Sequence, residues 1–211
     1  MAARAAADPS SRSHISLPAF LQDAALVLVS TLFFWANARE ALDGHLRNIP
    51  FAFEQGLLVF MFLSRRRAIA TSSRPMDWVV AIGGWTALLL RPHDGDSLPQ
   101  LVGTGIQVAG LCLVFVGFSY LGRSFGVVAA NRGLKVNGPY RIVRHPIYFA
   151  HFVTMSGYIV GNPTPWNIAV FALTAVFQVL RISAEERILS DTANYSEYRA
   201  RVRYRLLPGI W

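Results

Sequence analysis

The segment from residue 133 to residue 148 has cationic and imidazole side chains next to a sequence that strongly predicts the start of a helix. A Gly-Pro turn at 138–139 precedes Arg144, His145 and Pro146. Proline is favoured at the first position of a helix because its missing N–H would have no partner there. A helix is therefore predicted to begin at Pro146, with His145 near its N-cap. Free backbone N–H groups at such an end attract carboxylates and phosphates. Taken alone, the segment is explained at least as well by arginines that contact lipid headgroups.

A second group of chemically capable side chains follows about 40 residues later. Arg181 and Glu185 are four residues apart and share one helix face. Glu186 is adjacent to Glu185, in a chain that has only 12 acidic residues. A guanidinium can orient an anion, and a carboxylate can accept a proton. A simple ion pair between Arg181 and Glu185 is the structural alternative.

Apolar blocks must position these two groups. The chain of 211 residues is 53% apolar and 15% charged, well below the charge of soluble domains, which is about 25%. A bilayer core about 30 Å thick needs roughly 20 helical residues. The predicted fold class is an all-α polytopic transmembrane bundle of about six spans. Five spans remain an alternative, because three of the blocks are short. The blocks are 17–36, 49–63, 76–90, 101–121, 146–161 and 165–182.

Basic residues indicate the orientation of the spans. With six spans and the N-terminus inside, only Arg39, Arg47 and Arg91 of the 20 basic residues fall on the outer side. The positive-inside rule then places the other side, which carries both chemical groups, in the cytoplasm. Residues 1–16 are predicted to be a cytoplasmic tail. The Ala-Asn-Ala sequence at 36–38 could be a signal-peptidase site, although an uncleaved first span is favoured.

Several classes of site are disfavoured. The net charge of +8 is explained by the membrane surface, so no nucleic-acid partner is predicted. The single cysteine, Cys112, allows neither an internal disulfide nor a multi-cysteine zinc site, and no metal is predicted. Gly103, Gly110 and Gly117 recur every seven residues and share a helix face. They predict close helix packing rather than a nucleotide-binding loop.

The two polar segments together resemble a known family. Arg144-His145-Pro146-x-Tyr148, followed by Glu185-Glu186 and by two tyrosines at 195 and 198, is similar to isoprenylcysteine carboxyl methyltransferases and their phospholipid methyltransferase relatives. The similarity covers roughly residues 120–208. It divides the chain into N-terminal transmembrane helices at 17–121 and a methyltransferase-like core at 122–211.

The resemblance implies a cleft for S-adenosylmethionine at the cytoplasmic face, without a Rossmann domain. Arg181 and Glu186 are the candidate catalytic residues. Family members often have His where this chain has Arg132 and Gly where it has Ala150, which puts cofactor affinity or the lipid-facing entrance in doubt. The implied cofactor-binding residues are Leu134, Lys135, Tyr140, Arg144, His145, Pro146, Ile147, Tyr148 and Glu185.

The resemblance leaves the methyl acceptor open. A lipophilic small molecule or lipidated substrate in a bacterial cytoplasmic or ER-type membrane is expected. A carboxylate or thiol is favoured because Arg181 would repel an ammonium. The alternatives are a phospholipid amine with Glu186 as general base, an NADPH-dependent sterol-type reductase, and a non-catalytic scaffold that binds membrane lipids. The oligomeric state is not predicted.

Three ionisable residues fall inside the apolar blocks, namely Asp23, Glu54 and His151. Such groups are costly in lipid and are therefore functional candidates. His151 follows Tyr148 by three residues and shares its helix face, so it could border a substrate tunnel. A histidine that hydrogen-bonds between helices is the alternative.

Overall fold

The structure is a computed structural model that describes residues 17–44, 49–64, 70–72, 74–91, 97–124, 130–192, 194–209 and 211. The predicted tail at 1–16 and the arginines at 65–67 lie outside the described residues. The first three helical elements are α1 (Leu17–Leu42), α2 (Ile49–Ser64) and α3 (Pro75–Gly83), which continues as a 3-10 turn (Gly84–Leu89). The later helices are α4 (Ser97–Leu121), α5 (Pro146–Gly161), α6 (Pro165–Leu189) and α7 (Tyr195–Arg201). Short 3-10 turns occupy Gly122–Ser124 and Gly138–Arg141.

Each of the six apolar blocks is helical, which confirms the predicted helical class. In the described part of the chain, two helices are long and apolar enough to cross a membrane, at Leu98–Ser124 and Pro165–Leu189. The helix at Ile49–Ser64 is apolar but shorter. The number of spans therefore stays a prediction. A two-residue antiparallel pair, β1 (Ala70–Thr71) with β2 (Ala130–Asn131), is the described exception to the helical fold.

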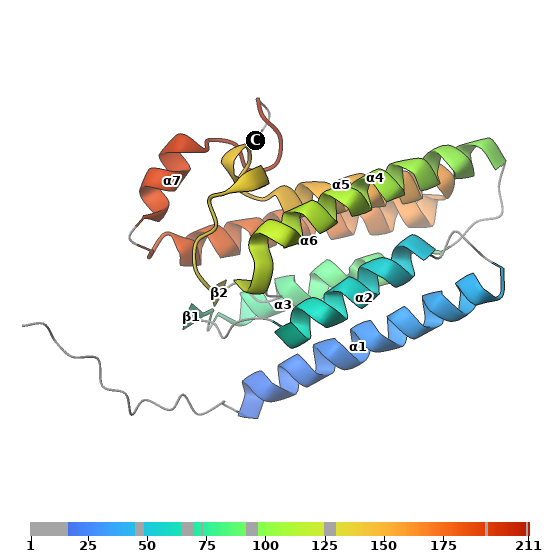
Figure 1. The fold of residues 1–211 in the computed structure, drawn as a ribbon, viewed down its shortest axis with the longest axis horizontal. Helices are drawn as coiled ribbons and strands as arrows, with labels where there is room; N and C mark the ends of the chain where they lie inside the picture. Colours follow the sequence, from blue (N-terminus) through green and yellow to red (C-terminus); the bar gives the residue numbers. More distant parts are fainter. Residues whose placement is uncertain are drawn as a thin grey trace, which may run out of the picture.

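Helices α4 and α5 pack side by side along their length (Figure 1). The predicted glycine face makes this possible. A Cβ added at Gly103 would lie 2.5 Å from the carbonyl oxygen of Gly157, and one at Gly110 would lie 2.6 Å from the backbone nitrogen of Thr154. The prediction of close packing is confirmed. Gly117 lies against Ile147 in the same way, so the stripe also fixes the start of α5.

Replacing Gly110 with alanine is expected to destabilise the protein by about 1–3 kcal/mol, because the methyl group would overlap the backbone of α5. Gly105 lies on the same helix, but a Cβ there meets nothing within 4 Å. Gly105→Ala is therefore the matched control and should leave stability unchanged or slightly raised. Unfolding in mixed micelles, followed by circular dichroism, measures the stability of both variants. An equal loss of stability in the two variants would contradict this account of the contact between α4 and α5.

A short turn reverses the chain between α5 and α6. The Thr164 side chain caps α6 by accepting a hydrogen bond from the backbone N–H of Asn167 at 3.1 Å. The Asn167 side chain in turn donates to the carbonyl oxygen of Arg91 at 2.8 Å. Because the turn is tight, α6 runs back along α5. The start of α5 and the end of α6 therefore lie at the same end of the bundle (Figure 1).

Candidate active site

The two predicted polar segments meet at this end of the bundle. The Tyr148 hydroxyl donates to Glu185 Oε1 at 2.5 Å. One residue further along α6, Glu186 Oε1 accepts from Arg144 Nε at 2.7 Å. Helix α5 begins at Pro146 with His145 as its N-cap, as predicted. The expectation that the Arg-His-Pro segment and the paired glutamates converge is confirmed.

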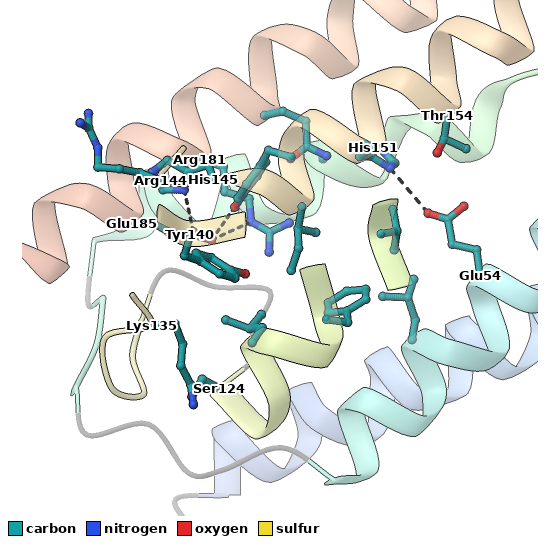
Figure 2. A pocket seen from close by; sticks show the side chains of 18 of the residues that line it. Glu54, Ser124, Lys135, Tyr140, Arg144, His145, His151, Thr154, Arg181 and Glu185 are labelled. Atoms are coloured by element: carbon teal, nitrogen blue, oxygen red, sulfur yellow. Dashed lines mark hydrogen bonds and ion pairs between the residues drawn. The ribbon is translucent and has the colours of Figure 1, made fainter. Parts of the chain in front are cut away.

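A cavity of about 300 Å³ opens beside these contacts. Figure 2 shows it from close by. Two of the predicted site residues, Pro146 and Glu186, are buried and are not among the residues that line it. The predicted residues that do line it are Leu134, Lys135, Tyr140, Arg144, His145, Ile147, Tyr148, Arg181 and Glu185. The structure thus brings nine of the eleven candidates to one cavity.

The lining also includes residues that the sequence did not single out for this site. Helix α2 contributes Phe51, Gln55 and Leu58. The 3-10 turn after α3 contributes Gly84 and Trp85. These elements lie far from the motifs in sequence, and apolar or uncharged side chains inside apolar blocks carry no signal of a site. Glu54, also from α2, did carry a sequence signal of a site, because it is charged within an apolar block.

Glu185 is the polar centre of the cavity wall. Besides accepting from Tyr148, its carboxylate lies 3.5 Å from Arg181 Nε and 3.9 Å from His145 Nδ1. The Arg181 guanidinium also lies over the Tyr148 ring, 5.5 Å from its centroid. The Glu185 side chain keeps 23% of its surface exposed. It is therefore oriented by neighbours and still open to a ligand.

Glu186 has a different environment. Its side chain is 6% exposed and forms ion pairs with Arg144 at 2.7 Å and with Arg205 at 2.8 Å. His145 Nε2 lies 3.2 Å from the same carboxylate. These partners occupy both carboxylate oxygens, and the residue lies behind the cavity wall. This position suits a residue that holds His145 and Arg144 in place, and it does not favour the predicted role of Glu186 as a general base.

The C-terminal segment completes this arrangement. The backbone N–H groups of Arg144 and His145 donate to the carbonyl oxygens of Tyr204 and Arg205, each at 2.9 Å. The Arg144 side chain also donates to the carbonyl oxygens of Val202 and Arg203, at 2.8 and 2.7 Å. Main-chain carbonyls carry no side-chain signal, so sequence reasoning missed this role of residues 202–205.

Two buried tyrosines connect the cavity to α7. The Tyr198 hydroxyl donates to the carbonyl oxygen of Tyr140 at 2.8 Å. Burial raises the pKa of Tyr198 to about 12 and also raises the pKa of Tyr140. Both phenols are therefore neutral at physiological pH. Tyr198 acts as a hydrogen-bond donor that fixes the turn preceding Arg144.

Part of the chain that forms this cavity is similar to a known family. Residues 99–195 match the phospholipid methyltransferase family. The match runs from the start of α4 to the first residue of α7 and includes most of the site. This match agrees with the resemblance found in the sequence. No curated protein matches the chain.

Proposed function

We propose that this protein is an integral membrane methyltransferase that uses S-adenosylmethionine and methylates a lipophilic acceptor. The observation that carries the proposal is the Glu185 carboxylate, held by Tyr148 and Arg181 at the wall of a cavity in the phospholipid methyltransferase region. An oriented carboxylate beside aromatic rings suits the ammonium of a methionine moiety and a nearby sulfonium.

The residues present fit this cofactor. Glu185 would bind the ammonium group, and the cationic side chains of Arg132 and Lys135 line the same cavity and suit the carboxylate. Tyr140 and Leu134 offer an aromatic and apolar wall for the adenosine moiety. S-adenosylmethionine would supply an activated methyl group on a positively charged sulfur.

The protein's own contribution is positioning. Methyl transfer from a sulfonium needs alignment more than acid–base help, and alignment alone can supply much of the acceleration. The ion pairs of Glu186 fix Arg144 and His145, and the Tyr148 hydroxyl fixes Glu185. We therefore propose that Glu186 positions the site, while Glu185 contacts the cofactor.

The rest of the cavity suits an apolar acceptor. Its lining beyond the polar end is mainly hydrophobic, with Leu58, Phe62, Val114 and Phe118 among the contributors. A carboxylate or thiol acceptor was favoured because Arg181 is cationic. Arg181 pairs with Glu185, which offsets that charge. A phospholipid amine is therefore the second candidate acceptor, supported by the Glu54 carboxylate in the cavity and by the family's description.

The proposed topology has six spans, with the N-terminus and the active site in the cytoplasm of a bacterial or ER-type membrane. The charge distribution and the shared end of α5 and α6 support it, because both site segments then lie on the same side.

Cofactor binding separates the proposed enzyme from the alternatives. Purified protein in detergent should bind S-adenosylmethionine in calorimetry and should not bind NADPH. Membranes incubated with the cofactor, radiolabelled in its methyl group, should yield a labelled lipophilic product that mass spectrometry identifies. Binding of NADPH alone would favour a reductase. Cofactor binding without transfer to any component of a membrane lipid extract would favour a scaffold.

A further inference from the structure

A second polar cluster lies deeper in the same cavity, across from the proposed cofactor-binding residues. Glu54 of α2 and His151 of α5 face each other, with Glu54 Oε1 3.7 Å from His151 Nδ1 (Figure 2). Both residues line the cavity, and their side chains are 14% and 24% exposed. The distance exceeds that of a hydrogen bond. The contact is close enough for an ion pair but leaves both groups with hydrogen-bonding capacity for a ligand.

The pair lies one helical turn further into the bundle than the Tyr148–Arg181 contact. His151 follows Tyr148 by three residues on α5, a rise of about 4.5 Å. Gln178 precedes Arg181 by three residues on the antiparallel α6 and so lies at a similar depth. Phe51 of α2 makes an edge-to-face contact with Tyr158 of α5, at 5.5 Å between ring centroids. The pair therefore lies in the cavity beyond Tyr148 and Arg181, on the side away from the helix start at Pro146.

Hydrogen-bonding capacity is unused around the pair. Within the described part of the chain, His151 Nε2, Gln55 Oε1 and Gln178 Oε1 are buried and have no hydrogen-bond partner, and all three residues line the cavity. Buried polar atoms are nearly always paired, so such a group needs an explanation. The Glu54 carboxylate and the amide oxygens can only accept hydrogen bonds. A ligand that satisfies them must be a donor.

We propose that Glu54 and His151 form the subsite for the nucleophilic group of the methyl acceptor and receive its proton. This inference rests on the proposed methyltransferase function. Of the acceptors considered above, it favours an amine or a thiol over a carboxylate, because a carboxylate would be repelled by Glu54 and could donate nothing. The subsite depends on α2, which lies outside the region that matches the family.

The reaction balances with a sulfonium methyl donor as co-reactant. The acceptor nitrogen or sulfur forms a bond to the methyl carbon, and the carbon–sulfur bond of the donor breaks with its electron pair left on sulfur. The acceptor's proton passes to Glu54 Oε1. His151, with Nδ1 beside that oxygen, positions the carboxylate and stabilises the protonated pair.

A binding experiment tests the donor requirement without turnover. Dodecylamine, dodecanethiol and dodecanoate share one alkyl length and can each be titrated into the protein in nanodiscs. The amine or the thiol should bind at least ~10-fold more tightly than dodecanoate, and Glu54→Gln should weaken that binding by ~10-fold or more. Glu197→Gln removes an exposed carboxylate elsewhere and should have no effect. Tightest binding of dodecanoate, or no effect of Glu54→Gln, would overturn the proposal.

A kinetic experiment tests the proton transfer, using whichever probe accepts methyl groups. Glu54→Gln and His151→Gln should each lower kcat by ~100-fold or more at neutral pH while S-adenosylmethionine still binds. The kcat of the double variant should be little lower than that of either single variant, because the two residues act as a unit. The acidic fall in kcat of the wild type should change in both single variants. The other ionisable residues lining the cavity are Arg132, Lys135, Tyr140, Arg144, His145, Tyr148, Tyr158, Arg181, Glu185, Tyr195 and Tyr198.

The possible failures are distinguishable. If the wild type does not bind S-adenosylmethionine, the proposed function fails, and the binding of the three alkyl probes still tests the subsite. If transfer occurs and both variants keep the wild-type rate and pH profile, only the subsite is wrong. Circular dichroism checks that each variant is folded. If the Glu54→Gln variant does not fold, Glu54→Asp and Glu54→Ala replace it in the binding experiment. Glu54→Asp keeps the charge and should bind the probe more tightly than Glu54→Ala. Equal probe binding by these two variants would contradict the proposal.

Discussion

Glu185→Gln is expected to lower the affinity for S-adenosylmethionine by about 100-fold and to abolish detectable methyl transfer. The substitution keeps the size of the side chain but removes the charge that pairs with Arg181 and would bind the cofactor's ammonium. Loss of one partner of such a hydrogen-bonded charge pair typically costs about 2–5 kcal/mol, and each 1.4 kcal/mol is about tenfold in affinity. Calorimetry with purified protein measures the affinity, and the radiolabel assay measures the transfer.

The effect should be local to the cavity. Glu185→Gln should retain the wild-type circular dichroism spectrum, because Tyr148 can still donate to the remaining carbonyl oxygen. Glu197 is also four residues from an arginine on a helix, Arg201, but its side chain is 77% exposed. Glu197→Gln is therefore the matched control and should bind the cofactor normally. Normal cofactor affinity in Glu185→Gln would remove the observation on which the proposed function rests.

Glu186→Ala is expected to destabilise the protein by about 3–5 kcal/mol, because the buried Arg144 would lose its counterion. Arg205 and His145 would lose the same partner. The C-terminal segment should then separate from the start of α5, and cofactor binding should fall as a consequence. Unfolding in mixed micelles, followed by circular dichroism, gives the change in free energy.

The two roles considered for Glu186, general base and positioning residue, lead to different expected results when it is replaced by glutamine. Glu186→Gln can still accept a hydrogen bond from one of the two arginines and should recover part of the stability lost in Glu186→Ala. If Glu186 were the general base, the glutamine variant would bind S-adenosylmethionine as the wild type does and yet transfer no methyl group. Glu197→Ala should change stability by less than about 1 kcal/mol, as exposed ion pairs do.

The sequence predicted the features that depend on local patterns. Helix starts follow from the position of proline, as at Pro146, and close packing follows from glycines on one face of α4. The convergence of Tyr148 with Glu185 was predictable because a single helical hairpin separates the two motifs. The shortness of several blocks left the number of spans open, since length in sequence does not fix the tilt of a helix.

The sequence alone thus determined the helical class, the two polar segments and their meeting at one end of the bundle. Only the tertiary structure decided that neighbouring glutamates have different surroundings, with Glu185 open to the cavity and Glu186 buried among Arg144, Arg205 and His145. Successive residues on a helix point about 100° apart, so one faces the cavity while the next faces the C-terminal segment. The approach of Glu54 to His151 likewise depends on how the tertiary structure places α2 and α5 around one cavity, because no local pattern relates residues nearly a hundred positions apart.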